Sequence, residues 1–179
     1  MSTNADPSTP ANLGKPPPRP IHPDYHLRDG YPSVPDYVRL RSTPNLTPKT
    51  AEQATLAIAG SWFGCYVVHT ATDTPVGMGR IIGDGGWCFH IVDIAVATEH
   101  QRKGLGDAIM ARLIERIREV AAPGASVSLL ADPPGRKLYA RHGFEDTAPY
   151  SIVMYKNPWW PLMVEGEETT EKEARTEDK

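Results

Sequence analysis

The strongest pattern in the chain is an apolar run that is followed by an amphipathic stretch. From Phe89 to Ala97 nearly every residue is apolar or small, and several are β-branched, which predicts a strand covered on both faces. After Gly104 the period of the pattern changes to that of a helix. Its recurring apolar positions are Leu105, Ile109, Leu113 and Ile117. Charged residues lie between them, so we expect a surface helix that buries one face and ends near Val120.

Weaker patterns predict the elements on the N-terminal side of this unit. Alternation of polar and apolar residues predicts a strand from Tyr37 to Arg41. The pair Thr47-Pro48 predicts the start of a helix that ends near Gly60, because threonine caps a helix and proline fits its first position. Residues 62–70 and 76–82 predict two strands joined by a turn. These strands would form an antiparallel meander that leads into the apolar run.

Three further elements are predicted after the long helix. Residues 126–131 form a short segment that predicts a buried strand. Asp132, which is followed by Pro133, predicts the start of another helix, and Gly143 would end it. The stretch from Tyr150 to Lys156 predicts a last strand.

Composition divides the chain of 179 residues into one domain and two tails. Residues 1–35 are rich in proline and poor in hydrophobic residues, so we expect a flexible arm. Residues 36–157 would form the folded domain, and residues 158–179 would form an acidic tail. The arm contains the segment His22–His26, which we interpret as a polar linker, because zinc sites need more ligands from ordered structure. We therefore predict no metal site.

Charge and cysteine content narrow the class of protein. A formal net charge of −3 gives no sign of binding to nucleic acid or to an anionic membrane. No apolar run is long enough to cross a membrane, and the N-terminus is proline-rich instead of carrying an apolar signal segment. We expect Cys65 and Cys88 to be buried core residues without a disulfide, in a reducing compartment. These features predict a soluble cytoplasmic protein, and a nuclear location stays open.

The segment that joins the apolar run to the helix has a composition suited to anion binding. Between Gln101 and Gly106 two glycines open the helix, whose first backbone N–H groups have no partner within it. Together with the helix dipole these groups favour phosphate, and Arg102 and Lys103 add two cations. The glycine spacing fits neither a P-loop nor a Rossmann fingerprint. An ordinary strand-to-helix turn with solvated basic residues is the alternative at this point.

Two motifs carry a resemblance to a known family. The first resembles the central Gln/Arg-x-x-Gly-x-Gly/Ala motif of the GNAT superfamily of acetyl-CoA-dependent N-acetyltransferases. It runs Asp93-Ile94-Ala95-Val96, a polar turn, and Gln101-Arg102-Lys103-Gly104-Leu105-Gly106. The second, from Asp132 to Phe144, resembles the family segment Asn-x-x-Ala-x-x-Leu-Tyr-x-x-x-Gly-Phe. It departs from that segment in having Asp132 for Asn and in the run Pro133-Pro134-Gly135.

The resemblance, which covers roughly Tyr37 to Lys156, implies an α/β (α+β) GNAT fold. In that fold a mixed, mostly antiparallel central sheet is flanked by helices, and two splayed central strands hold acetyl-CoA. The central strand would contact the cosubstrate through its backbone, and the glycine-containing loop would bind the pyrophosphate. The residues that the resemblance assigns to acetyl-CoA are Ile94, Ala95, Val96, Gln101, Arg102, Lys103, Gly104, Leu105, Gly106, Asp132 and Tyr139.

The resemblance also implies catalytic roles. Tyr139 matches a tyrosine that donates a proton to the departing thiolate in many members, and packing against the sheet is its alternative role. Acidic or histidine residues on the central strand act as base or substrate anchor in several branches, which makes Asp93 and His90 the candidates here. In a regular strand these two side chains point to opposite faces, so only a bulge would let both reach one amine. A buried carboxylate, a core histidine and a water chain as the base stay open.

The implied function is the transfer of an acetyl group from acetyl-CoA to a primary amine of a small molecule. Acetylation of a protein or peptide amine is one alternative, and a non-catalytic module that binds acyl-CoA is another. No motif identifies the acceptor, because the first helix and adjoining loops that shape its pocket vary within the family. We expect no nucleic-acid or membrane partner, and a homodimer stays open.

Overall fold

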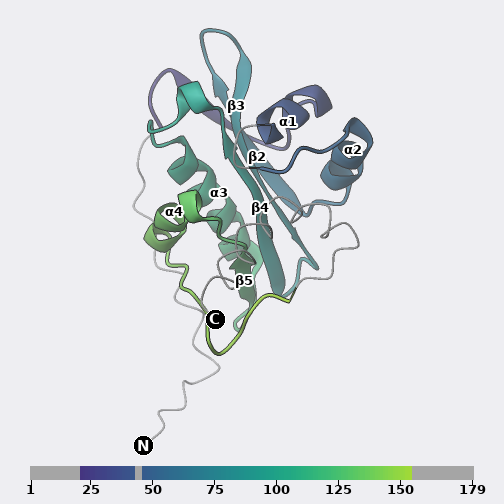
Figure 1. The fold of residues 1–179 in the computed structure, drawn as a ribbon, viewed down its shortest axis with the longest axis vertical. Coiled ribbons are helices and arrows are strands. Elements are labelled where there is room, and N and C mark those ends of the chain that lie inside the picture. The colour runs from purple at the N-terminus through teal and green to yellow at the C-terminus, as the bar shows by residue number, and fades with distance from the viewer. Residues whose placement is uncertain (1–20, 43–45, 155–179) are drawn as a thin grey trace, which may run out of the picture. The chain divides into compact units, whose positions relative to one another are not determined.

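A computed structural model describes residues 21–42 and 46–154, and within them a five-stranded sheet forms the centre of the fold (Figure 1). Its strands, in spatial as well as chain order, are β1 (Tyr25–Asp29), β2 (Phe63–His69), β3 (Thr74–Gly83), β4 (Cys88–Val96) and β5 (Ser126–Leu129). The first four strands pair antiparallel, and β5 pairs parallel with β4. The prediction of a mixed, mostly antiparallel sheet is therefore confirmed.

Helices cover both faces of this sheet. Figure 1 shows α1 (Val34–Arg41) and α2 (Ala51–Ala59) on one side, and α3 (Leu105–Val120) and α4 (Arg136–Arg141) on the other. Each side has its own group of buried apolar residues. The larger group lies between the sheet and α3, and α3 contributes to it Leu105, Ile109, Met110, Leu113, Ile114 and Ile117. The apolar stripe predicted for the long helix is thus the face that it buries.

The predicted strand from Tyr37 to Arg41 is wrong, because this segment lies in α1. Ser33 caps the helix: its hydroxyl accepts a hydrogen bond of 3.3 Å from the backbone N–H of Asp36. The buried positions are Tyr37, Leu40 and Arg41, which share one face of a helix. In so short a segment the polar and apolar residues alternate as they would in a strand. The hydrogen bond that the Ser33 cap accepts favours the helix instead.

The second helix begins later than predicted and ends where expected. Its cap is Thr50 and not Thr47, and Gln53 completes a reciprocal capping box with the backbone of Thr50. A capping box satisfies two N–H groups, whereas a Thr-Pro pair satisfies one, which favours the later start. The C-terminal cap is Gly60, as predicted.

Part of the proline-rich segment is ordered, so the prediction that residues 1–35 form a flexible arm is wrong for β1. This strand pairs along its whole length with β2, from Tyr25 opposite His69 to Asp29 opposite Cys65. Tyr25 is buried, and Leu27 packs against the same core. The backbone pairing and this apolar contact offset the ordering entropy of the strand. Residues 1–20 lie outside the described residues.

The C-terminal elements differ from the predictions in detail. Asp132 makes no capping hydrogen bond through its side chain, and the short 3₁₀ turn Pro133–Gly135 precedes α4. Gly143, at φ +85°, follows α4 in the left-handed conformation expected for a helix-ending glycine. The predicted strand from Tyr150 is not formed over residues 150–154, and residues 155–179 lie outside the described part of the chain.

The chain divides into two compact units, residues 1–145 and 146–179, and every helix and strand given above belongs to the first. Within that unit Cys65 is buried, and burial raises the pKa of its thiol to about 12. Cys88 is exposed, which corrects the expectation that both cysteines lie in the core. Among the described residues, no helix combines the length and the apolar character needed to span a membrane.

Candidate active site

The central strand carries a bulge next to the predicted site. Arg80 of β3 pairs with Val92, and Met78 pairs with Ala95, so a single residue of β3 faces both Asp93 and Ile94 of β4. Asp93 adopts a positive φ of +57°, which few non-glycine residues do. Because of the bulge, Asp93 lies on the same face of the sheet as His90. The strand is thus not regular here, and the bulge is the condition under which the sequence allowed these two side chains to share a face.

A cavity of about 490 Å³ lies beyond this bulge. It is bounded by the end of β4, the loop before α3, and the segment that leads into α4. Ten of the residues predicted to bind acetyl-CoA line it, namely Ile94, Ala95, Val96, Gln101, Arg102, Gly104, Leu105, Gly106, Asp132 and Tyr139. The tertiary structure thus brings the two sequence motifs, which are some thirty residues apart, to a single cavity.

The loop before α3 is shaped by two residues with left-handed backbones, Arg102 at φ +64° and Gly104 at φ +80°. Gln101 fixes its beginning, since the side-chain amide of Gln101 donates a hydrogen bond of 3.0 Å to the carbonyl of Val96. Space is tight at Gly106, where a Cβ atom would lie 3.2 Å from Leu138. The loop and the first turn of α3 therefore present backbone to the cavity, as an anion site requires.

Of the residues predicted to bind acetyl-CoA, Lys103 is the one that does not line the cavity. Its ammonium group donates a hydrogen bond of 2.8 Å to the hydroxyl of Tyr25. The same hydroxyl lies 2.9 Å from Nδ1 of His100, a residue that does line the cavity. Burial lowers the pKa of His100, so its ring is neutral at neutral pH. Lys103 therefore fastens the loop to β1.

Sequence reasoning missed Asp107 in the first turn of α3 and its two partners at the end of α4, Arg141 and His142. The carboxylate of Asp107 lines the cavity, where a negative charge would oppose an anion. It accepts a hydrogen bond of 2.9 Å from Arg141, and Nε2 of His142 lies 3.3 Å away. The charge of Asp107 is thereby offset by Arg141. Asp107 is the third residue of a helix whose start is predicted to bind an anion, and an acidic residue there could have prompted a search for its counter-ion.

Tyr139 lies half-buried at the opposite wall of the cavity. Its ring packs so closely on Gly135 that a Cβ atom there would come within 2.6 Å of the ring. Burial raises the pKa of the Tyr139 phenol, and the negative charge of Asp132 raises it further. The phenol is therefore protonated at neutral pH and able to donate a proton into the cavity.

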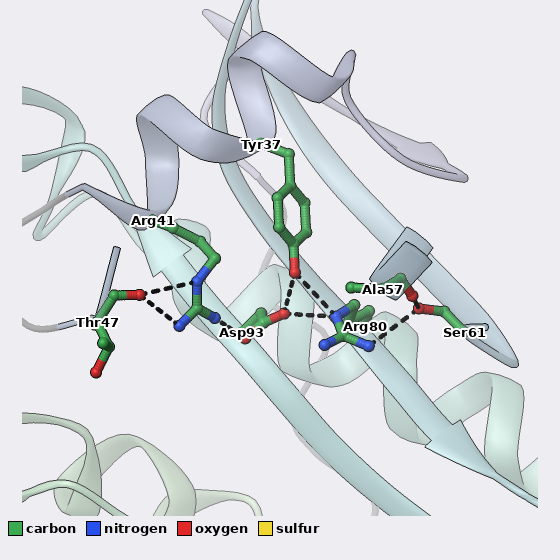
Figure 2. Close-up of polar contacts among 7 residues, drawn as sticks. All are labelled: Tyr37, Arg41, Thr47, Ala57, Ser61, Arg80 and Asp93. Carbon is green, nitrogen blue, oxygen red and sulfur yellow. Dashed lines mark hydrogen bonds and ion pairs between the residues drawn. The ribbon is translucent and has the colours of Figure 1, made fainter. Parts of the chain in front are cut away.

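The two candidate bases do not line the cavity. Nδ1 of His90 lies 2.8 Å from the hydroxyl of Ser128 on β5, and burial lowers its pKa. Asp93 accepts hydrogen bonds from Tyr37, Arg41 and Arg80, as Figure 2 shows. Both oxygens of the Asp93 carboxylate accept hydrogen bonds. Asp93 is therefore the buried, hydrogen-bonded carboxylate that the sequence allowed as the alternative to a catalytic base. The part of the chain that the structure describes contains no cluster of residues able to hold a metal ion.

Comparison with known proteins decides the family. The model of the acetyltransferase (GNAT) family matches residues 34–144, which is more than half of the chain. The chain belongs to the GNAT family. Members of this family use acetyl-CoA as cosubstrate, and the cavity lies where the two family motifs meet.

Solved structures agree with this GNAT assignment. A probable acetyltransferase from meticillin-resistant Staphylococcus aureus is 38% identical, with a TM-score of 0.70, over 74% of this chain and 98% of that protein. A putative acetyltransferase from Deinococcus radiodurans shares the fold at 17% identity and a TM-score of 0.61, over 79% and 92% of the two chains. Glucosamine-6-phosphate N-acetyltransferase from Arabidopsis thaliana also shares the fold. Its sequence identity is 16% and its TM-score is 0.58, over 75% of this chain and 98% of that protein. No match is found among curated proteins.

Proposed function

We propose that this GNAT protein transfers the acetyl group of acetyl-CoA to the primary amine of a small molecule. The observation that carries the proposal is the cavity of about 490 Å³, which joins the bulged end of β4, the start of α3 and Tyr139. These three parts match what the reaction needs. A polarised carbonyl requires nearby donors, a pyrophosphate requires an anion site, and a departing thiolate requires an acid.

The residues of the cavity fit acetyl-CoA. The loop from Gln101 to Gly106 and the first N–H groups of α3 would hold the pyrophosphate, with the guanidinium of Arg102 beside them. Gly106 leaves its backbone accessible because it carries no Cβ atom. The backbone from Ile94 to Val96 would line the pantetheine arm. When bound, the cosubstrate supplies the activated acetyl group as a thioester.

Tyr139 is the acid in this proposal. A thiol has a pKa of about 8.5, and a phenol has one of about 10 before burial raises it, so a phenol that stays protonated can return a proton to a thiolate. The half-buried position of the phenol also limits competition from bulk water. The proton that the attacking amine loses would pass to water, since Asp93 is fully bonded and His90 lies outside the cavity.

The choice of a small amine as the acceptor rests on a relative that has the same fold. The GNAT fold relative from Arabidopsis is named for an amine of a small phosphorylated sugar, which shows that this fold accommodates such acceptors. Leu46, which follows α1, lines the cavity together with residues of β4.

The test is release of free thiol from acetyl-CoA across a panel of amines and peptides, together with calorimetry of CoA binding. We expect turnover with at least one small primary amine. Turnover with peptides alone would show that the acceptor is a peptide or protein amine and not a small molecule. Binding of CoA without turnover on any acceptor would favour a non-catalytic GNAT module.

A further inference from the structure

Behind the bulge lies a buried ionic cluster that the reaction scheme above does not use (Figure 2). Arg41 of α1 binds one carboxylate oxygen of Asp93, and Nε of Arg80 on β3 binds the other at 2.5 Å. The three side chains are only 9%, 14% and 8% exposed for Arg41, Arg80 and Asp93. Figure 2 shows the two guanidinium groups approaching Asp93 from opposite sides, beneath α1.

The cluster ties several elements to the bulge. Arg41 donates two hydrogen bonds, of 3.2 and 2.8 Å, to the carbonyl of Thr47, which follows the cavity residue Leu46. Arg80 donates a hydrogen bond of 3.1 Å to the hydroxyl of Ser61 at the end of α2. Tyr37 donates to Asp93 and accepts from Nε of Arg80. The strained backbone of Asp93 is therefore held by contacts from α1, β3 and the loop after α1.

The cluster also carries an uncompensated charge, because two guanidinium groups face one carboxylate. Burial acts to lower the pKa of Arg80, but the charge and hydrogen bond of Asp93 outweigh it, and the pKa is raised. Burial raises the pKa of the neighbouring phenols Tyr31 and Tyr37, so both are neutral. Burial lowers the pKa of His90 on β4, which is neutral as well. These titratable neighbours thus leave one positive charge on the described cluster.

The position of this charge gives it a use. Asp93 immediately precedes Ile94 and Ala95 in the chain, and both of these residues line the cavity. We propose that Arg41, Asp93 and Arg80 form a positioning cluster for acetyl transfer, which fixes the bulge and places a surplus positive charge behind the reacting end of the cavity. The proposal rests on the proposed function. A positive potential there stabilises an oxyanion, favours a thiolate, and disfavours the protonated form of an acceptor amine.

This role fits the balance of the reaction. The nitrogen of the neutral amine forms a bond to the acetyl carbon, the carbon–sulfur bond breaks, the nitrogen loses a proton to water, and the sulfur gains one from Tyr139. The attacking amine must be neutral, although an alkylammonium has a pKa of about 10. A buried positive charge lowers that pKa without requiring a free base at the site.

The test measures the pKa of the thiol of bound CoA from its thiolate absorbance, because this needs no acceptor. Removing one unit charge at about 10 Å, with an effective dielectric constant of about 20, corresponds to about one pKa unit. We expect Arg80→Gln to raise the thiol pKa by about one unit and Asp93→Asn to lower it. Arg80→Lys keeps the charge and Tyr37→Phe removes only hydrogen bonds, so both should leave the thiol pKa close to that of the wild type.

The turnover and folding of the same variants provide a second test. On an acceptor that the wild type turns over, Arg80→Gln should lower kcat about tenfold or more while the dissociation constant of CoA stays unchanged, and Arg80→Lys should restore part of kcat. If Arg80→Gln fails to fold, Arg41→Gln carries the same charge test. An unchanged thiol pKa in the folded charge variants would overturn the proposal. Turnover of no amine, with the thiol shifts present, would overturn the proposed function alone.

Discussion

The ammonium group of Lys103 lies 2.8 Å from the hydroxyl oxygen of Tyr25, 78 residues away in the sequence. The ammonium also lies 5.5 Å from the centre of the Tyr25 ring, on its face. These contacts direct one of the two cations of the loop toward β1, whereas the other, Arg102, lines the cavity. The two adjacent residues thus have different contacts, and we expect them to have different functions.

Arg102→Ala and Lys103→Ala should separate these functions. We expect Arg102→Ala to weaken CoA binding by about tenfold, since it removes a charge-assisted contact to phosphate. Lys103→Ala should change the dissociation constant by no more than about twofold, and should lower the melting temperature because the loop loses its contact with β1. Calorimetry and thermal unfolding measure both effects. Equal losses of CoA affinity in the two variants would contradict this assignment.

Gly106 offers a test of the anion site itself. Gly106→Asp should weaken CoA binding by more than about tenfold, because it places a negative charge at the first turn of α3. Gly106→Ala is the matched control: its Cβ atom would meet only the flexible end of Leu138, at 3.2 Å, and it adds no charge. We expect a small effect from this variant in the same titration. Wild-type affinity in a folded Gly106→Asp variant would remove the loop from the site.

Tyr139→Phe should separate catalysis from binding. The phenylalanine ring keeps the packing on Gly135, so CoA affinity and thermal stability should change little. If the hydroxyl protonates the thiolate, kcat should fall about 10²-fold or more, because the hydroxyl acts in the transition state. A steady-state comparison on an amine whose acetylation is limited by chemistry measures this. An unchanged kcat would mean that the proton comes from water or another residue.

The direction of the Tyr139 pKa adds a pH dependence. Burial raises this pKa, so the acidic form persists to higher pH than that of a free phenol. Activity that needs the protonated phenol is therefore complete below the raised pKa and is lost only as the pH rises through it. The decrease of kcat at high pH, which is the alkaline limb of its pH profile, should therefore be absent in Tyr139→Phe. A limb that persists unchanged would assign it to another group.

Asp84 should stabilise the turn between β3 and β4 in a pH-dependent way. Its Oδ1 accepts backbone hydrogen bonds of 2.8, 3.0 and 3.0 Å from Gly86, Trp87 and Cys88, and these bonds lower its pKa, that from Cys88 most. Because the pKa is lower in the folded state, the stabilisation is present above the unfolded pKa and is lost as the pH falls through the folded one.

Asp84→Ala should therefore unfold at a lower urea concentration than the wild type at about pH 7, and the difference should shrink at about pH 3. Asp84→Asn is the control, since its amide oxygen can still accept hydrogen bonds but carries no charge. It should remove the pH dependence and retain part of the stability. Equal midpoints for the wild type and Asp84→Ala at neutral pH would show that the turn does not need the carboxylate.

Local signals in the sequence were sufficient to predict the unit of β4, the loop and α3. These signals are an apolar run, two glycines, and apolar residues at helical spacing from Leu105 to Ile117. The glycine stops at Gly60 and Gly143 are local as well, because a helix end depends on the conformation of one residue. Most residues that line the cavity could also be predicted, because they belong to two sequence motifs that resemble those of the GNAT family.

The remaining features could not be predicted from local patterns, since each depends on a contact between residues that are distant in the sequence. The strand β1 is ordered by pairing with β2, and Tyr37 became helical although its segment alternates. The role of Asp93 depends on Arg41, 52 residues away, and on a bulge that shifts the register against β3. A single residue inserted into one strand reverses which face the following side chains occupy. No local pattern encodes that insertion, because its stability comes from partners supplied by other elements.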